Sequence, residues 1–298
     1  MFRQFLSRLH KYEIRIRKAV SNPRQGNFHS VFKGSGLDFS DLRQYQYGDD
    51  VRAIDWNTSA KGHGIYVKLF KEEKEQTVFF LLDVSGSQQV GVPQRLKIDA
   101  SREICGVLTL AAVKEASLVG LQCFSDQNER YVRPSGGMKQ AYRIISALYN
   151  LVPQSRKTNI SRGILHALEI LNRRSLVFLI SDFADSGYEL HLKALARKHD
   201  LIVIHIYDKH EQDVPSMGII PIINTETGEK SWVNTSSPFY RNYVAEQYEQ
   251  KAKSLEIICR QNKADYIAVE ASEDFVPALI RLFRVRQYQK ARVSGKQG

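Results

Sequence analysis

The chain has 298 residues, of which 43% are hydrophobic and 25% charged, as in soluble globular proteins with a large core. Its apolar runs are only long enough for strands, which excludes a membrane-spanning helix. Its N-terminus lacks the continuous apolar stretch of a signal peptide. Three cysteines in apolar surroundings, with no CxxC pair, are expected to be buried thiols: Cys105, Cys123 and Cys259. We therefore expect a cytoplasmic protein.

The net charge of +11 is concentrated at the two ends of the sequence. Residues 1–35 carry a net charge of +7 and residues 281–298 carry +6, so the residues between them carry −2. Such basic ends are typical of solvated terminal segments. They are equally compatible with a surface that faces nucleic acid, anionic lipid or an acidic protein, and the sequence does not decide between these interpretations.

Residues 1–72 are predicted to form an N-terminal helix followed by a small β-rich extension. Apolar residues recur at steps of three and four over the first twenty positions, which indicates a helix. The Gly- and Asp-rich residues 34–56 favour turns and short strands, and residues 65–70 alternate as a strand does. We expect the aromatic residues of the extension to pack on the sheet, and its acids to stabilise turns or pair with arginines: Tyr45, Tyr47, Trp56, Asp49, Asp50, Asp55, Arg43 and Arg52.

Residues 73–290 are predicted to form an α/β domain, a doubly wound, mostly parallel six-stranded sheet. The apolar run at 77–83 has the composition of a strand that is buried on both faces. After it, expected strands at 117–124, 130–134, 175–181, 201–208 and 265–269 alternate with expected helices near 94–115, 138–151, 161–173, 188–199, 239–262 and 273–289. Residues 218–234 are predicted to be a hairpin insertion, and residues 291–298 a basic tail.

Polar side chains lie in three loops that this fold brings to one edge. Asp83, Ser85 and Ser87 follow the strand at 77–83, Asp182 follows the strand at 175–181, and Thr158 lies between two helices. Ligands of doubly wound folds bind at the carboxyl ends of the strands. Two carboxylates and three hydroxyls supply hard oxygen atoms, which suit Mg²⁺, Mn²⁺ or Ca²⁺. The sequence therefore predicts a metal site at this edge.

A competing explanation is that these side chains only cap local structure. Ser85 or Ser87 could cap the next helix, and Asp182 could cap a turn. For one loop alone capping would be the better explanation. Three such loops in the right order favour the metal site, because a buried aspartate without a cation is costly.

The D-x-S-x-S sequence at 83–87, followed by Thr158 and Asp182, resembles the metal-ion-dependent adhesion site of von Willebrand factor A domains. The upstream sequence LDFSDLRQYQYGDDVRAIDWNTSAK, followed by YVKLFKEE, resembles a bacterial and archaeal family known as the fifty-eighth domain of unknown function. The resemblance covers about residues 28–290. Many relatives carry Asp where this chain has Asn159, and many have N-terminal membrane-spanning helices, so this chain resembles a short soluble form.

The resemblance implies a function in protein binding. Members of the family are commonly encoded beside AAA+ ATPases of the MoxR type and are thought to work with them. It implies that Ser85, Ser87 and Thr158 approach the metal, that Asp83 and Asp182 hold it, and that an acidic side chain of a client protein completes its coordination. We therefore expect a non-enzymatic, metal-dependent interaction module in chaperone-like or complex-assembly work.

Two alternatives from other functional classes remain open. A phosphatase of the haloacid dehalogenase type would use Asp83 as its nucleophile, but it needs a second acid two residues later as proton donor, where this chain has Ser85. A nucleic-acid-binding protein would use the basic ends, but the sequence has none of the usual phosphate-loop, helix-turn-helix or zinc-finger motifs.

Overall fold

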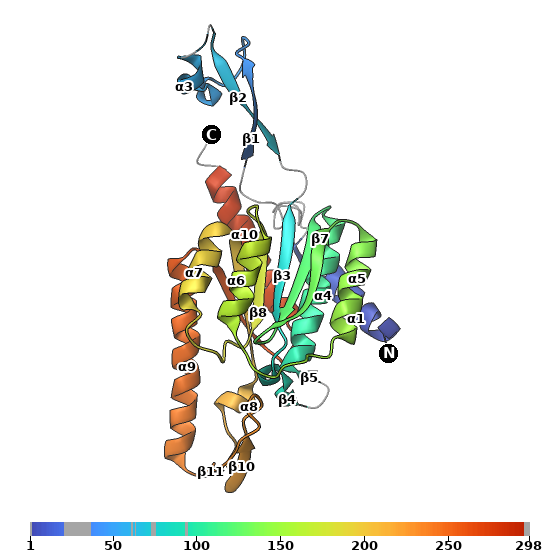
Figure 1. Cartoon of the computed structure of the whole chain (residues 1–298), viewed down its shortest axis with the longest axis vertical. Helices are drawn as coiled ribbons and strands as arrows, with labels where there is room; N and C mark the ends of the chain where they lie inside the picture. The colour runs from blue at the N-terminus through green and yellow to red at the C-terminus, as the bar shows by residue number, and fades with distance from the viewer. Residues whose placement is uncertain are drawn as a thin grey trace.

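The computed structural model describes residues 2–20, 37–60, 62, 64–72, 76–92 and 95–294. Its centre is a six-stranded sheet with the order β12-β9-β8-β3-β6-β7 (Figure 1). All neighbouring strands are parallel except β6 and β7, which are antiparallel. The strands are β3 (Thr77–Asp83), β6 (Leu118–Phe124), β7 (Asn128–Ser135), β8 (Leu176–Ser181), β9 (Asp200–Tyr207) and β12 (Asp265–Glu270). This arrangement confirms the predicted fold class.

Helices cover both faces of the sheet because its central strands are apolar on both faces. Along β3, Phe80 and Leu82 belong to one hydrophobic core and Phe79 and Leu81 to the other, as the two-residue period of a strand requires. The first core is closed by α1 (Phe2–Val20), α4 (Lys97–Lys114), α5 (Met138–Asn150) and α10 (Val276–Ser294). The second is closed by α6 (Ile160–Ile170), α7 (Glu189–Lys198) and α9 (Pro238–Gln261).

The N-terminal helix α1 packs on the sheet domain, between α4 and α10. Its apolar stripe is buried in the first core, and Leu9 lies so close to Gly106 of α4 that a Cβ there would meet its Cδ1 at 2.7 Å. Arg15 forms an ion pair with Asp274 at 2.8 Å. The domain boundary at residue 72 stays a proposal. Although α1 precedes this boundary in the sequence, its apolar side chains belong to the core of the sheet domain.

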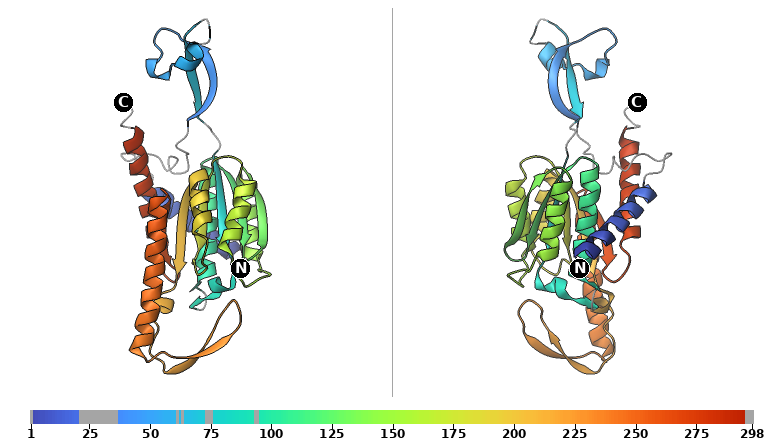
Figure 2. Two further views of the ribbon diagram at one scale, coloured as in Figure 1. Left: turned by 60° about the vertical axis from the view of Figure 1, so that its left-hand side comes forward. Right: turned by 90° about the vertical axis from the view of Figure 1, so that its right-hand side faces the viewer.

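The extension is an antiparallel hairpin of β1 (Leu37–Gln44) and β2 (Tyr66–Glu72), with the short helices η1 (Val51–Ala53) and α3 (Trp56–Ser59) between them. The expectation for its acids is confirmed: Arg43 binds Asp49 at 2.6 Å, and Asp50 and Asp55 accept backbone hydrogen bonds at the starts of η1 and α3. The expected packing of its aromatic residues on the sheet is wrong. Tyr47 is 105% and Trp56 66% exposed, because this hairpin stands clear of the sheet (Figure 2).

A second hairpin lies at the opposite end of the molecule, beyond the carboxyl ends of the parallel strands (Figures 1 and 2). It consists of β10 (Ile219–Ile223) and β11 (Lys230–Asn234), and the short helix α8 (Lys209–Gln212) precedes it. At the same edge lie η2 (Gly86–Gln89) and the two-residue strands β4 (Gly91–Val92) and β5 (Arg95–Leu96). Among the described residues, none of the helices combines the length and the hydropathy needed to cross a membrane.

Candidate functional site

Asp83 is the last residue of β3, and its side chain is fully buried. Its Oδ1 accepts a hydrogen bond from the backbone N–H of Ser85 at 2.9 Å. Its Oδ2 accepts one from the hydroxyl of Ser181 at 2.6 Å, at the end of the neighbouring strand β8. Burial, and then the negative charge of Asp182, raise the pKa of Asp83 to about 7. A nearby cation would relieve both unfavourable effects.

Ser85, Ser87 and Asp182 continue this network. The hydroxyl oxygens of Ser85 and Ser87 are 3.0 Å apart, and the Ser87 hydroxyl donates to Asp182 Oδ1 at 3.3 Å. Ser85 precedes η2 but makes no side-chain cap, whereas Asp182 accepts a hydrogen bond from the backbone N–H of Ala184 at 3.3 Å. Local capping therefore accounts for one oxygen of Asp182 and for neither serine.

Thr158 lies beside these four residues but is linked to them indirectly. Its loop contacts the serine loop through Arg156, whose carbonyl oxygen accepts a hydrogen bond from the Gly86 backbone N–H at 2.7 Å. The Thr158 hydroxyl itself donates to Glu226 Oε1 at 2.5 Å. Glu226 belongs to the turn of the β10–β11 hairpin, so the fifth predicted residue already has a carboxylate from its own chain as its partner.

Lys97 is the main site residue that sequence reasoning missed. It begins α4, is only 2% exposed, and its Nζ lies 2.8 Å from Asp182 Oδ2 and 2.9 Å from both carboxylate oxygens of Glu211 on α8. Burial alone would lower the pKa of Lys97, but the charges of Asp182 and Glu211 outweigh it and raise the pKa above its usual range. Asp182 therefore has a permanent cationic partner on the side away from Ser87.

The donor set around Asp83 fits a small, hard divalent cation. The 3.0 Å between the two serine hydroxyl oxygens matches adjacent ligands of an octahedral Mg²⁺ with bonds of about 2.1 Å. Within the described part of the chain, no three His, Cys, Asp or Glu side chains are grouped so that they could hold a metal. Such an ion would therefore depend on hydroxyl and water ligands beside its two carboxylates, as Mg²⁺ commonly does. A phosphatase that uses Asp83 as its nucleophile would need a second acid two residues later, and the structure places the hydroxyl of Ser85 there, 3.0 Å from that of Ser87.

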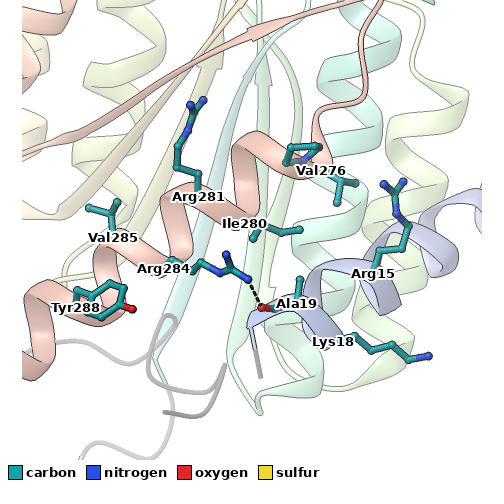
Figure 3. A pocket seen from close by; sticks show the side chains of 10 residues that line it. Arg15, Lys18, Ala19, Val276, Ile280, Arg281, Arg284, Val285 and Tyr288 are labelled. Atoms are coloured by element: carbon teal, nitrogen blue, oxygen red, sulfur yellow. Dashed lines mark hydrogen bonds between the residues drawn. The ribbon is translucent and has the colours of Figure 1, made fainter. Parts of the chain in front are cut away.

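The basic ends meet in a groove of about 900 Å³ between α1 and α10 (Figure 3). Val276 and Ile280 lie on its apolar floor, while Lys18, Arg281 and Arg284 surround it. Arg284 donates to the Ala19 carbonyl oxygen at 3.1 Å. Of the described residues, Arg15 and Lys18 from the N-terminal end and Arg281 and Arg284 from the C-terminal end therefore line one groove.

The family profile described as "Protein of unknown function DUF58" matches residues 41–254. The chain belongs to this family. It is 21% identical to the uncharacterized protein Rv1480 of Mycobacterium tuberculosis over 225 residues, which cover 74% of this chain and 70% of that protein. An uncharacterized protein of Mycobacterium bovis matches to the same extent.

Among solved structures, the chain is similar to an aerotolerance-related membrane protein from Bacteroides fragilis, with a TM-score of 0.50 and 15% identity. The match covers 72% of this chain and 99% of that chain. A protein named BatB from Bacteroides thetaiotaomicron matches with a TM-score of 0.48 and 15% identity, over 71% of this chain and 98% of that chain. The similarity to the Bacteroides fragilis protein is one of fold, and it extends over most of the α/β domain that the sequence predicts.

Proposed function

We propose that this protein is a non-enzymatic interaction module that binds its partners through a metal ion at the carboxyl edge of β3 and β8. The observation that supports the proposal best is the buried network in which Asp83, Ser85, Ser87 and Asp182 converge from two strand ends. Asp182 is paired with Lys97, but among the described residues buried Asp83 accepts hydrogen bonds from neutral groups alone, which is costly for a carboxylate unless a cation lies close to it.

The charges of the site explain why a partner would supply an acid. Asp182 shares its charge with Lys97, and the serines are neutral ligands, so a bound divalent ion keeps part of its positive charge. When bound, the metal supplies electrophilic attraction for a carboxylate. The side chains of this chain supply position: Asp83 and Asp182 fix the ion, and Ser85 and Ser87 orient its open side.

We further propose that a MoxR-type AAA+ ATPase and a client protein with an exposed acidic side chain are the partners, in the cytoplasm. The choice of these partners rests on the resemblance of the sequence to a family whose members are commonly encoded beside MoxR-type ATPases. Mg²⁺ is the metal that the donor set favours, ahead of Mn²⁺ or Ca²⁺. The binding groups of the wild-type chain would be the five residues Asp83, Ser85, Ser87, Thr158 and Asp182.

Calorimetric titration of Mn²⁺ or Mg²⁺ into the purified chain tests the metal site. Asp83→Asn and Asp182→Asn should each lower the affinity at least about 100-fold, because each removes a charged ligand. Asp126→Asn is the matched control, since Asp126 follows β6 at the same edge and bonds within its own loop. Equal affinity of all four proteins would refute a site at Asp83.

Capture of the ATPase tests the function of the site. An immobilised wild-type chain should retain a MoxR-type ATPase in Mg²⁺ and release it in EDTA, and the Asp83→Asn variant should retain neither the ATPase nor its client. Retention that is indifferent to both EDTA and the substitution would show that the partner binds elsewhere.

A further inference from the structure

The turn of the β10–β11 hairpin holds Glu226 in a defined orientation. The Asn224 side chain accepts hydrogen bonds from the backbone N–H groups of Glu226 at 2.9 Å and Thr227 at 3.2 Å. Gly228, with a φ of +75°, closes the turn, and its N–H donates to the Asn224 carbonyl at 2.8 Å. An Asx-type turn of this kind fixes the backbone at Glu226, and the hydrogen bond from Thr158 places its carboxylate.

Two adjacent residues of this turn contact two different loops of the strand-end site. Glu226 accepts a hydrogen bond from the Thr158 hydroxyl at 2.5 Å. The carbonyl oxygen of Thr225 lies so close to Gly86, between the two site serines, that a Cβ on Gly86 would meet it at 2.7 Å. Thr225 and Glu226 are half-buried, whereas the following residues of the turn, 227–229, are exposed. The turn is therefore seated on the site by these two residues.

The root of the hairpin is fixed separately. Helix α8 precedes β10, and its Glu211 is held by the buried ammonium of Lys97. The hairpin is thus anchored at its base by one ion pair and reaches the site at its tip with one carboxylate. Three of its apolar side chains, Ile219, Ile223 and Trp232, are exposed.

From these contacts we infer that Glu226 is an internal ligand of the metal site, which occupies the position that the proposed function assigns to a partner's carboxylate. This inference rests on the proposed function and adds a regulation to it. A partner's acid binds by displacing Glu226 and the turn that carries it. The free protein is therefore in a closed state, and only a partner with affinity enough to displace the turn gains the metal.

Mn²⁺ bound to the full chain gives a direct test, because the relaxation of solvent water protons reports how many water molecules the ion carries. In Glu226→Gln the bound ion should carry one more exchanging water than in the wild type, and the Mn²⁺ affinity should fall by about tenfold or more. Added acetate should remove that water from the variant at concentrations that leave the wild type unchanged. Glu229→Gln is the control, since Glu229 lies in the same turn but bonds Thr227.

The outcomes separate this inference from the proposed function. If Asp83→Asn abolishes Mn²⁺ binding but Glu226→Gln matches the wild type in affinity, water number and acetate response, the internal ligand is refuted and the metal site stands. A Glu226→Gln protein that melts at a lower temperature with an unchanged water number would likewise refute it, since Glu226 would then only support Thr158. Failure of the wild type to bind Mn²⁺ would refute both.

Discussion

The two hairpins of this molecule have similar construction and different surroundings. Both are antiparallel pairs whose turns are organised by Asp or Asn side chains, Asp49 in one and Asn224 in the other. The β1–β2 hairpin stands clear of the sheet and exposes Tyr47 and Trp56, whereas the β10–β11 hairpin places Glu226 against Thr158. Similar local chemistry thus yields a free-standing arm in one place and a cap over a site in the other.

What differs is the chemistry beyond the turn. Among the described side chains of the β1–β2 hairpin, Arg43 and Asp49 pair with each other, and Asp50 and Asp55 cap η1 and α3. In the β10–β11 hairpin the Glu226 carboxylate bonds outside the hairpin, to the Thr158 hydroxyl at the edge of the sheet. Whether a hairpin packs against the sheet domain therefore depends on long-range polar contacts. Each of the following changes tests how strongly these contacts act.

Replacing Lys97 by Met should have the largest effect. It leaves Asp182 and Glu211 facing each other without their buried cation, and unfolding in urea should show a loss of about 3–5 kcal/mol. Hydrogen exchange in β10 and β11 should speed up while that of β1 and β2 does not. In the control Lys209→Met, whose exposed ammonium pairs with Glu273, no measurable change is expected. Equal hydrogen-exchange protection of β10 and β11 in the wild type and in Lys97→Met would contradict the proposed difference between the hairpins.

His199, in the sheet domain between the two hairpins, should contribute less to stability in mild acid than at neutral pH. Burial, followed by the charges of Lys198 and Arg174, lowers the pKa of His199 to about 4, and its Nδ1 accepts a hydrogen bond from the Ser175 N–H at 3.3 Å. The unfolded chain binds this proton near the ordinary value of 6.5, so the contribution of His199 is full above pH 6.5 and falls as the pH drops toward 4. The raised pKa of Asp83 acts in the opposite direction, so the test is the difference between two proteins. In urea unfolding, the stability of the wild type relative to His199→Gln should fall by roughly 2 kcal/mol from pH 7 to pH 4.5. A difference that stays constant with pH would refute this role of His199.

Adding one methyl group to Gly86 should unseat the β10–β11 turn. The new Cβ would meet the Thr225 carbonyl oxygen at 2.7 Å and the Arg156 carbonyl oxygen at 2.9 Å, which should cost about 1–2 kcal/mol by overpacking. Gly64→Ala in the β1–β2 region is the matched control, because the nearest atom, Gln44 Nε2, would be 3.7 Å away, and its stability should change by less than about 0.5 kcal/mol. Thermal unfolding of the two variants measures the contrast. Equal melting temperatures of the two variants would mean that the β10–β11 turn moves away from Gly86 without a measurable loss of stability.

Exposed tryptophans on the two hairpins should have the smallest effects on folding and unequal effects on binding. Trp232 on β11 is 71% exposed and Trp56 at the start of α3 is 66% exposed, so replacing either by Ala should change stability by less than about 0.5 kcal/mol. Because β11 belongs to the hairpin whose turn contacts Thr158, Trp232→Ala should weaken partner capture, by about tenfold for an aromatic contact residue. Trp56→Ala should not. The reverse result, measured by the same capture assay, would move the partner to the β1–β2 hairpin.

Much of this arrangement was predictable because it follows from the period of side chains along strands and from the rule for strand ends. Continuous apolar runs at 77–83 and 175–181 indicated buried parallel strands, and parallel strands end at a common edge. The proximity of Asp83 and Asp182 follows from that geometry alone. The exposure of Tyr47 and Trp56 was not predictable in this way, because whether a β hairpin packs on a neighbouring body depends on linkers and long-range contacts.

The contacts that complete the site could be predicted only in part. Lys97 carries a usable signal: it shares one helical face with Ser101, Ile104 and Leu108, all buried, and a lysine on such a face needs an acidic partner. Glu226 carries none, since a turn sequence such as TETGEK predicts its own backbone and not the loop it touches. Ion pairs between residues distant in sequence, such as Lys97 with Glu211, are set by the assembled fold.

The packing of α1 against α10 has a consequence for how the protein is made. Arg15 of α1 pairs with Asp274, which lies just before α10, and the two residues are 259 positions apart in the sequence. A ribosome that adds about 5–20 residues per second finishes α10 roughly 10–50 s after Arg15. During that interval α1 can already pack on α4 and α5, through contacts such as those of Leu9 with Gly106 and of Phe2 with Tyr149. The basic groove therefore forms last, and in the nascent chain its positive charges are still two separate segments.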